Sequence, residues 1–331
     1  MKTLISPIPS RTLVAKSKRS ILTRAMTWAF TAAGASLMAT VPALAADNGQ
    51  ADQKPLEVVT SFSVLADLTH QVGGDRVRVE SLIKPGGDPH VFQPGPAQVR
   101  QLAGANLFVI NGLGLEGWMS RLKGSSGFKG PVVVASQGIK TRKAEGNENE
   151  HHHHHGELDP HAWHDVENVR HYVSNIAEGL CKASPADCNG FQERARAYDQ
   201  KLQQLDQEIH SAVNAIPAEK RRVMVSHSAF GYYGRAYQIK FMAPVGVSTE
   251  EEPSAATVGT LIREARRQKV HAFFFENNSD PRLLKRMASE LKNVSIGELY
   301  ADSLSPADGP AADYISMMNF NTKAITGALA H

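Results

Sequence analysis

The 331-residue chain has little of the residue types that mark several protein classes. Two cysteines are too few for a disulfide-dense scaffold. Charged residues make up 21% and hydrophobic residues 42%, which excludes collagen, a coiled coil and wholesale disorder. After residue 45, no apolar run is long enough to span a membrane. The length allows two domains of roughly 100–200 residues each.

The formal net charge of +3 hides an uneven distribution of basic residues. Residues 1–45 contain six Lys and Arg and no acid, so the remainder has 30 Lys and Arg against 33 Asp and Glu. A mildly acidic chain lacks the basic surface that nucleic-acid binding requires. We therefore expect no nucleic-acid partner.

The first 45 residues have the layout of a secretory signal peptide. A basic segment at 1–24 precedes an apolar stretch at 25–41, followed by Pro42 and the small-residue triplet at 43–45. This layout predicts export to the periplasm and cleavage near Ala45. The alternative is a membrane anchor, but about 17 apolar residues is the short limit for a span. No cysteine near that site offers lipid attachment, so we expect an exported, soluble mature chain.

Strand and helix patterns alternate along the mature chain, which predicts βαβ units and mainly parallel sheets. The expected strands are residues 56–60, 77–83, 107–111, 132–135, 223–225, 241–247, 272–275 and 294–298. The expected helices beside them are residues 62–73 (with Ser61 as N-cap), 97–103, 116–123, 230–237, 257–268, 281–291 and 314–329. Ligands of such folds bind outside the carboxyl ends of strands.

Two helices without strands between them are expected in the middle of the chain, at 166–180 and 192–216. The second could reach roughly 37 Å, and its apolar residues recur at helical spacing before Pro217 ends it. Cys181 and Cys188 flank the turn between the two helices. In an oxidising compartment they could form a disulfide, and two free thiols are the alternative.

Three histidines and one aspartate lie in loops: His90 in GGDPH, His161 in LDPHAWHD, His227 in SHSAFGYYG and Asp302 in ELYADS. Three imidazoles and one carboxylate suit a four-coordinate zinc ion. Any one of these residues alone could equally be an ordinary polar or capping side chain. Their wide separation in sequence does not by itself bring them together.

These motifs, with DYISMMNFN near the end, resemble the zinc and manganese solute-binding proteins of bacterial ABC transporters. The resemblance covers essentially the whole mature chain. It implies an α/β fold of two lobes, each with a mainly parallel sheet flanked by helices. One long helix, here 192–216, would bridge the lobes, with metal in the interlobe cleft. The ligands that it implies here are His90, His161, His227 and Asp302.

The same resemblance implies three parts of the mature chain. An N-terminal lobe would span 46–165 and include the His-rich insert at 147–157. A helical segment would follow at 166–217, and a C-terminal lobe at 218–331. The insert contains five consecutive histidines, which could form a weak accessory zinc collector or could simply be solvated: His151, His152, His153, His154 and His155.

The ligand types favour the zinc branch of the family. Manganese binders of the family usually carry an acid at the position of His227, and a second carboxylate suits a harder ion. We expect a monomer that captures periplasmic Zn²⁺ with high affinity and delivers it to an ABC permease in the inner membrane. Manganese or mixed-metal binding is the alternative. A zinc hydrolase would need an open coordination position, which Asp302 fills. A surface adhesin would be expected to carry the missing lipid-attachment cysteine.

Two further residues near the motifs have open roles. His164 stands three residues after His161, where the family motif commonly has a small or apolar residue, and we assign it no metal contact. Glu276 follows an apolar strand and could lie at the cleft floor or act as a structural acid. Trp163, Tyr232 and Tyr233 are expected to pack around the site.

Overall fold

The computed structural model describes residues 54–144, 158–250 and 252–330. The predicted signal peptide and the run of five histidines lie outside these residues. Within the described ranges, no helix is both long and apolar enough to cross a membrane.

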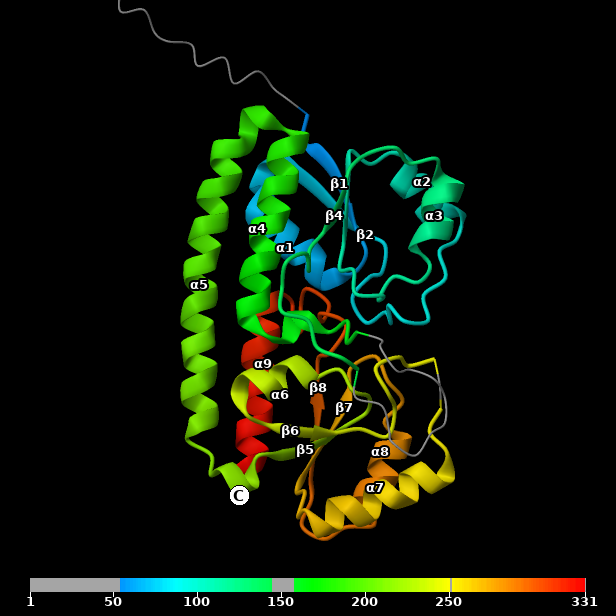
Figure 1. The fold of residues 1–331 in the computed structure, drawn as a ribbon, viewed down its shortest axis with the longest axis vertical. Coiled ribbons are helices and arrows are strands. Elements are labelled where there is room, and N and C mark those ends of the chain that lie inside the picture. Colours follow the sequence, from blue (N-terminus) through cyan, green and yellow to red (C-terminus); the bar gives the residue numbers. More distant parts are fainter. Residues whose placement is uncertain (1–53, 145–157, 251, 331) are drawn as a thin grey trace, which may run out of the picture. The chain divides into compact units, whose positions relative to one another are not determined.

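The first lobe is built on a parallel sheet with strand order β2-β1-β3-β4 (Figure 1). Every residue of the central strand β3 is buried, as expected for a parallel strand that is covered on both faces. The strands are β1 (Leu56–Thr60), β2 (Val77–Ser81), β3 (Leu107–Ile110) and β4 (Val132–Val134), and the helices are α1 (Ser63–Gly73), α2 (Pro96–Ala103) and α3 (Met119–Ser126).

The second lobe repeats this arrangement with a parallel sheet of order β6-β5-β7-β8. In both sheets the first strand in sequence lies between the second and the third, so the two lobes share one topology. The strands are β5 (Arg222–Val225), β6 (Lys240–Met242), β7 (Ala272–Glu276) and β8 (Ser295–Leu299), and the helices are α6 (Gly231–Tyr237), α7 (Ala255–Arg267), α8 (Arg282–Ser289) and α9 (Tyr314–Leu329).

Two long helices, α4 (Val166–Ala183) and α5 (Cys188–Asn214), lie between the sheets in sequence. Helix α5 has 27 residues and so is roughly 40 Å long. It contacts α1 and α4 along one half of its length and α6 and α9 along the other, and Figure 1 shows it running alongside both lobes. The predicted fold of two parallel-sheet lobes bridged by one long helix is confirmed.

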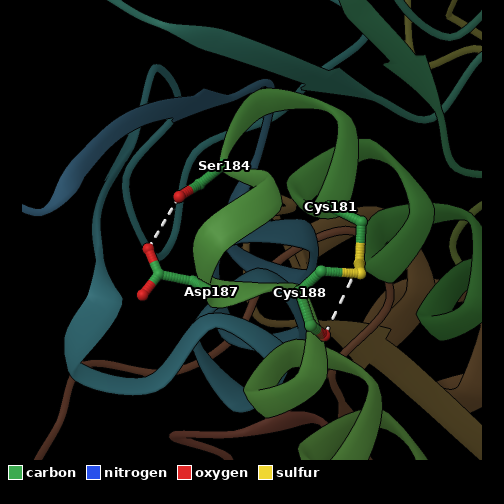
Figure 2. The surroundings of a disulfide bond; sticks show 4 residues. All are labelled: Cys181, Ser184, Asp187 and Cys188. Atoms are coloured by element: carbon green, nitrogen blue, oxygen red, sulfur yellow. Dashed lines mark hydrogen bonds between the residues drawn. A yellow bond between two sulfur atoms is a disulfide. The ribbon is translucent and has the colours of Figure 1, made fainter. Parts of the chain in front are cut away.

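A disulfide closes the turn between these two helices (Figure 2). It joins Cys181, near the end of α4, to Cys188, the first residue of α5. Within the turn the Ser184 hydroxyl donates a hydrogen bond to Asp187 at 2.7 Å. Asp187 also accepts a 2.7 Å bond from Arg76 Nε, which ties the turn to the first lobe.

Two expected helix starts in the first lobe are wrong for one shared reason. Ser61 does not cap helix α1, because its hydroxyl donates instead to the buried carboxylate of Glu116 at 2.8 Å. Helix α3 begins at Met119 rather than at residue 116. The Glu116 carboxylate accepts the backbone N–H of Asn111 at 2.7 Å, so it closes a turn after β3 instead of starting a helix.

Candidate metal centre

The four predicted ligand side chains meet at one point between the lobes. The donor atoms of His90, His161, His227 and Asp302 all lie within 4.8 Å of one another. The Nε2 atom of His161 is 3.1 Å from Nε2 of His90 and 3.2 Å from Nε2 of His227. The Asp302 carboxylate oxygens lie 3.3–3.6 Å from the three Nε2 atoms.

The parallel sheets explain why these residues converge. His90, His227 and Asp302 lie in the loops after β2, β5 and β8, which are the carboxyl ends of strands. A single parallel bridge from His227 to Val245 extends the pairing of β5 beyond the end of β6. The strand expected at 241–247 is shorter than predicted, because regular pairing ends at Met242 and only an isolated bridge follows it at Val245. His161 immediately precedes a short 3-10 helix, η2 (Ala162–His164), that leads into α4.

Both Asp-Pro-His sequences form the same local turn. The Asp88 carboxylate accepts the backbone N–H of His90 at 2.8 Å, and the Asp159 carboxylate accepts that of His161 at 3.0 Å. An aspartate that bonds the backbone two residues onward makes an Asx turn. Each turn fixes the backbone of a ligand histidine.

Asp159 also orients the ring of His161. Its Oδ1 lies 2.8 Å from His161 Nδ1, and its Oδ2 accepts a 2.6 Å bond from Arg142. The proton of the ring therefore belongs on Nδ1, and Nε2 presents its lone pair to the centre. Burial would raise the pKa of Asp159, but the hydrogen bond from His161 and the charge of Arg142 lower it overall. Burial lowers the pKa of His161 itself.

Glu276, the last residue of β7, plays the same part for His227. Its Oε1 accepts the His227 backbone N–H at 3.1 Å, and its Oε2 pairs with His227 Nδ1. Glu276 is buried, so water does not compete for these bonds. Burial would lower the pKa of His227, but the facing carboxylates of Glu276 and Asp302 raise it well above its ordinary value.

The Asp302 carboxylate places a buried negative charge at the centre. Asp302 is fully buried, and neither of its carboxylate oxygens has a hydrogen-bond partner among the described residues. The Nε2 atoms of His161 and His227 face the same point. A buried carboxylate without hydrogen bonds is destabilising unless positive charge lies beside it. Burial would raise the pKa of Asp302, but the adjacent His227 and His161 lower it well below its usual range.

The separations between donor atoms fit a small four-coordinate ion. A tetrahedron with metal–ligand bonds of about 2.0–2.1 Å has edges of about 3.3 Å. Five of the six separations between the donor atoms run from 3.1 to 3.6 Å, and all six lie within 4.8 Å. The donor set and its dimensions can therefore hold one divalent cation.

His164 lies outside this cluster. It is fully buried, and its ring packs 4.6 Å from the ring of Phe230 and 5.6 Å from that of Trp163. Both of its ring nitrogens lack a hydrogen-bond partner within the described part of the chain. Burial is the main cause that lowers the pKa of His164 to about 3, and the nearby His161 adds to it, so the ring is neutral at neutral pH. Trp163 packs 5.3 Å from the His161 ring.

Sequence reasoning missed Asp159, Arg142 and Asp88. The two aspartates had a local signal, because each stands two residues before a ligand histidine. Arg142 had none, since its partner Asp159 lies beyond an intervening low-complexity insert.

The fold and the ligand cluster together define a metal-binding, two-lobed solute-binding protein. Residues 58–328 match the family described as "Zinc-uptake complex component A periplasmic", and the chain belongs to this family. Its members are substrate-binding components of ABC transporters and not enzymes.

Individual relatives differ in the metal that their names give. The manganese ABC transporter substrate-binding lipoprotein PsaA of Streptococcus pneumoniae is 31% identical over 288 residues, which cover 85% of this chain and 91% of that protein. The periplasmic zinc-binding protein TroA from Treponema pallidum has a TM-score of 0.77 and 30% identity, covering 84% of this chain and 100% of that one. A manganese-bound periplasmic protein from Candidatus Liberibacter asiaticus has a TM-score of 0.73 and 26% identity, covering 83% and 99%.

Proposed function

We propose that this protein captures zinc in the periplasm with high affinity and delivers it to an ABC permease of the inner membrane. The observation that carries this proposal is the donor set: the imidazoles of His90, His161 and His227 with the carboxylate of Asp302. Imidazole nitrogen suits zinc, whereas carboxylate and carbonyl oxygens suit manganese. Five donor separations of 3.1–3.6 Å, close to the edge lengths of a tetrahedral zinc site, support the same ion.

Manganese is the second candidate, because the relative PsaA is named for manganese and the Liberibacter protein has been solved with manganese bound. Affinity for a given site of nitrogen and oxygen donors generally rises from manganese to zinc. We therefore propose that zinc binds more tightly here and that manganese binds as a weaker competitor.

The organisation of the chain is part of this proposal. We place a signal peptide at 1–45, one lobe at 46–165, the helical segment at 166–217 and the second lobe at 218–331, and we propose that the mature protein acts as a monomer. Helices α4 and α5 occupy the central segment, which supports this division.

Alanine substitution of the ligands tests the site. His90→Ala, His161→Ala and His227→Ala should each weaken zinc binding by about tenfold or more, or about 1.4 kcal/mol at least. Asp302→Ala should cost less, because water can take its place beside three imidazoles. The matched control is His70→Ala, an exposed histidine of helix α1. A histidine whose loss leaves zinc affinity at the parent value is not a ligand.

The metal preference has its own test in His227→Glu. Exchanging one nitrogen donor for a carboxylate makes the site harder and should narrow the gap between zinc and manganese affinity. The measurement is competition calorimetry with both metals. A gap that stays unchanged would show that the donor type at position 227 does not set the preference.

A further inference from the structure

The loop that carries His90 is held to the opposite lobe at two points. The Thr249 hydroxyl, in the segment after β6, donates a 2.6 Å hydrogen bond to Asp88 Oδ2. The Gly86 backbone N–H donates a 2.6 Å bond to Ser303 Oγ, in the loop after β8. Both bonds cross from one lobe to the other. The position of this ligand loop therefore depends on how the lobes meet.

Asp88 transmits the contact with Thr249 to the ligand itself. One of its oxygens accepts the Thr249 hydroxyl, and the other accepts the backbone N–H of His90. In the turn at His161, the corresponding carboxylate is that of Asp159, and its second oxygen accepts a hydrogen bond from Arg142. The two Asx turns are thus alike, but the turn at His90 takes its outer partner from the other lobe.

Thr249 and Asp88 also line a cavity that adjoins one ligand of the metal centre, His227. The cavity has a volume of about 510 Å³, and His227 and Glu276 form part of its wall. The Thr249–Asp88 bond therefore lies in the wall of the same cavity that His227 lines. Loss of this bond would free Asp88, and with it the backbone of His90, on the side that faces this cavity.

We propose that Thr249 is a positioning residue that bonds Asp88 across the lobes, keeps His90 on the bound metal and slows its release. This inference rests on the proposed metal-binding function of the four-residue centre. Its consequence is kinetic: loss of the hydroxyl raises the dissociation rate more than it changes the association rate.

The test uses the mature chain loaded with one equivalent of zinc and mixed with excess chelator in a stopped-flow instrument. Thr249→Val removes the hydroxyl at nearly constant volume and should raise the zinc dissociation rate about fivefold, the size expected of one hydrogen bond. Thr249→Ser keeps the hydroxyl and should restore a rate near that of the parent. The matched control, Thr260→Val, lies on the exposed face of α7 and should release zinc as the parent does.

The Asp88→Ala background separates positioning from a general structural defect. Without the Asp88 carboxylate, the Thr249 hydroxyl has lost the acceptor of this bond. Thr249→Val should then add no further increase in the zinc dissociation rate. Three results would overturn the inference. Thr249→Val could release zinc at the parental rate, or Thr260→Val could raise the zinc dissociation rate as much as Thr249→Val does. Thr249→Val could also raise the dissociation rate by its full factor in the Asp88→Ala background. If the parent chain bound no divalent metal at all, the proposed function itself would fail, which is a different result.

Discussion

Replacing Glu276 by Gln tests whether the carboxylate behind His227 prepares that histidine for metal. The carboxylate accepts two donors of the same residue, the backbone N–H and Nδ1–H. A glutamine of the same size has one oxygen, so its NH₂ group must face one of those two donors. If it faces Nδ1, the ring proton moves to Nε2 and blocks metal binding at that atom.

The size of the effect follows from burial. Glu276 is 1% exposed and His227 is 1% exposed, so water cannot replace the lost bond. Removing such a partner of a metal-bound histidine lowers metal affinity about 10- to 100-fold, or about 1.4–2.8 kcal/mol. We expect Glu276→Gln to weaken zinc binding within this range while the protein stays folded.

The assay is equilibrium competition between the protein and a zinc-binding dye. Glu264→Gln is the matched control, because Glu264 lies on helix α7 and pairs with Arg267 far from the ligands. Parental zinc affinity in Glu276→Gln would refute the role of Glu276 in orienting His227. An equal loss in Glu264→Gln would show that the effect is not specific to the centre.

Two other changes separate the metal centre from the rest of the chain. Cys181→Ser combined with Cys188→Ser opens a short loop and should lower the free energy of unfolding by about 2 kcal/mol in denaturant titration. Zinc affinity should stay unchanged, because the disulfide lies at the end of α4 that is away from His161. A loss of zinc affinity would contradict this expectation. Deleting residues 147–157 should keep one tight zinc and remove weaker zinc that fades below pH ~6.5, where imidazoles become protonated. Loss of the tight zinc would place a ligand inside the deleted segment.

The sequence was sufficient to place the ends of a strand or helix where one local pattern was strong. Strand β1 and helix α9 begin and end at the expected residues, because β1 is a short apolar run and Asp313, the residue before α9, accepts the backbone N–H of Ser316 with its side chain. The long helix α5 begins four residues earlier than expected. Gly190 argues against a helix there, but the buried Phe191 stabilises that first turn through tertiary packing.

In the candidate site, too, the sequence was sufficient for some residues and not for others. The four ligands could be predicted because each lies in a recognisable motif, and the structure brings all four together. Glu276 and Thr249 could not be assigned their partners from sequence. They meet His227 and Asp88 only because β5 pairs with β7 and the two lobes adjoin, and neither pairing leaves a local pattern.

The most direct test of the central claim is competition calorimetry of zinc and manganese on the metal-free mature protein at neutral pH. Three imidazoles and one carboxylate should bind one zinc per chain tightly and manganese more weakly by about 100-fold or more. Equal affinity for the two metals, or tighter binding of manganese, would contradict the assignment of zinc as the transported ion.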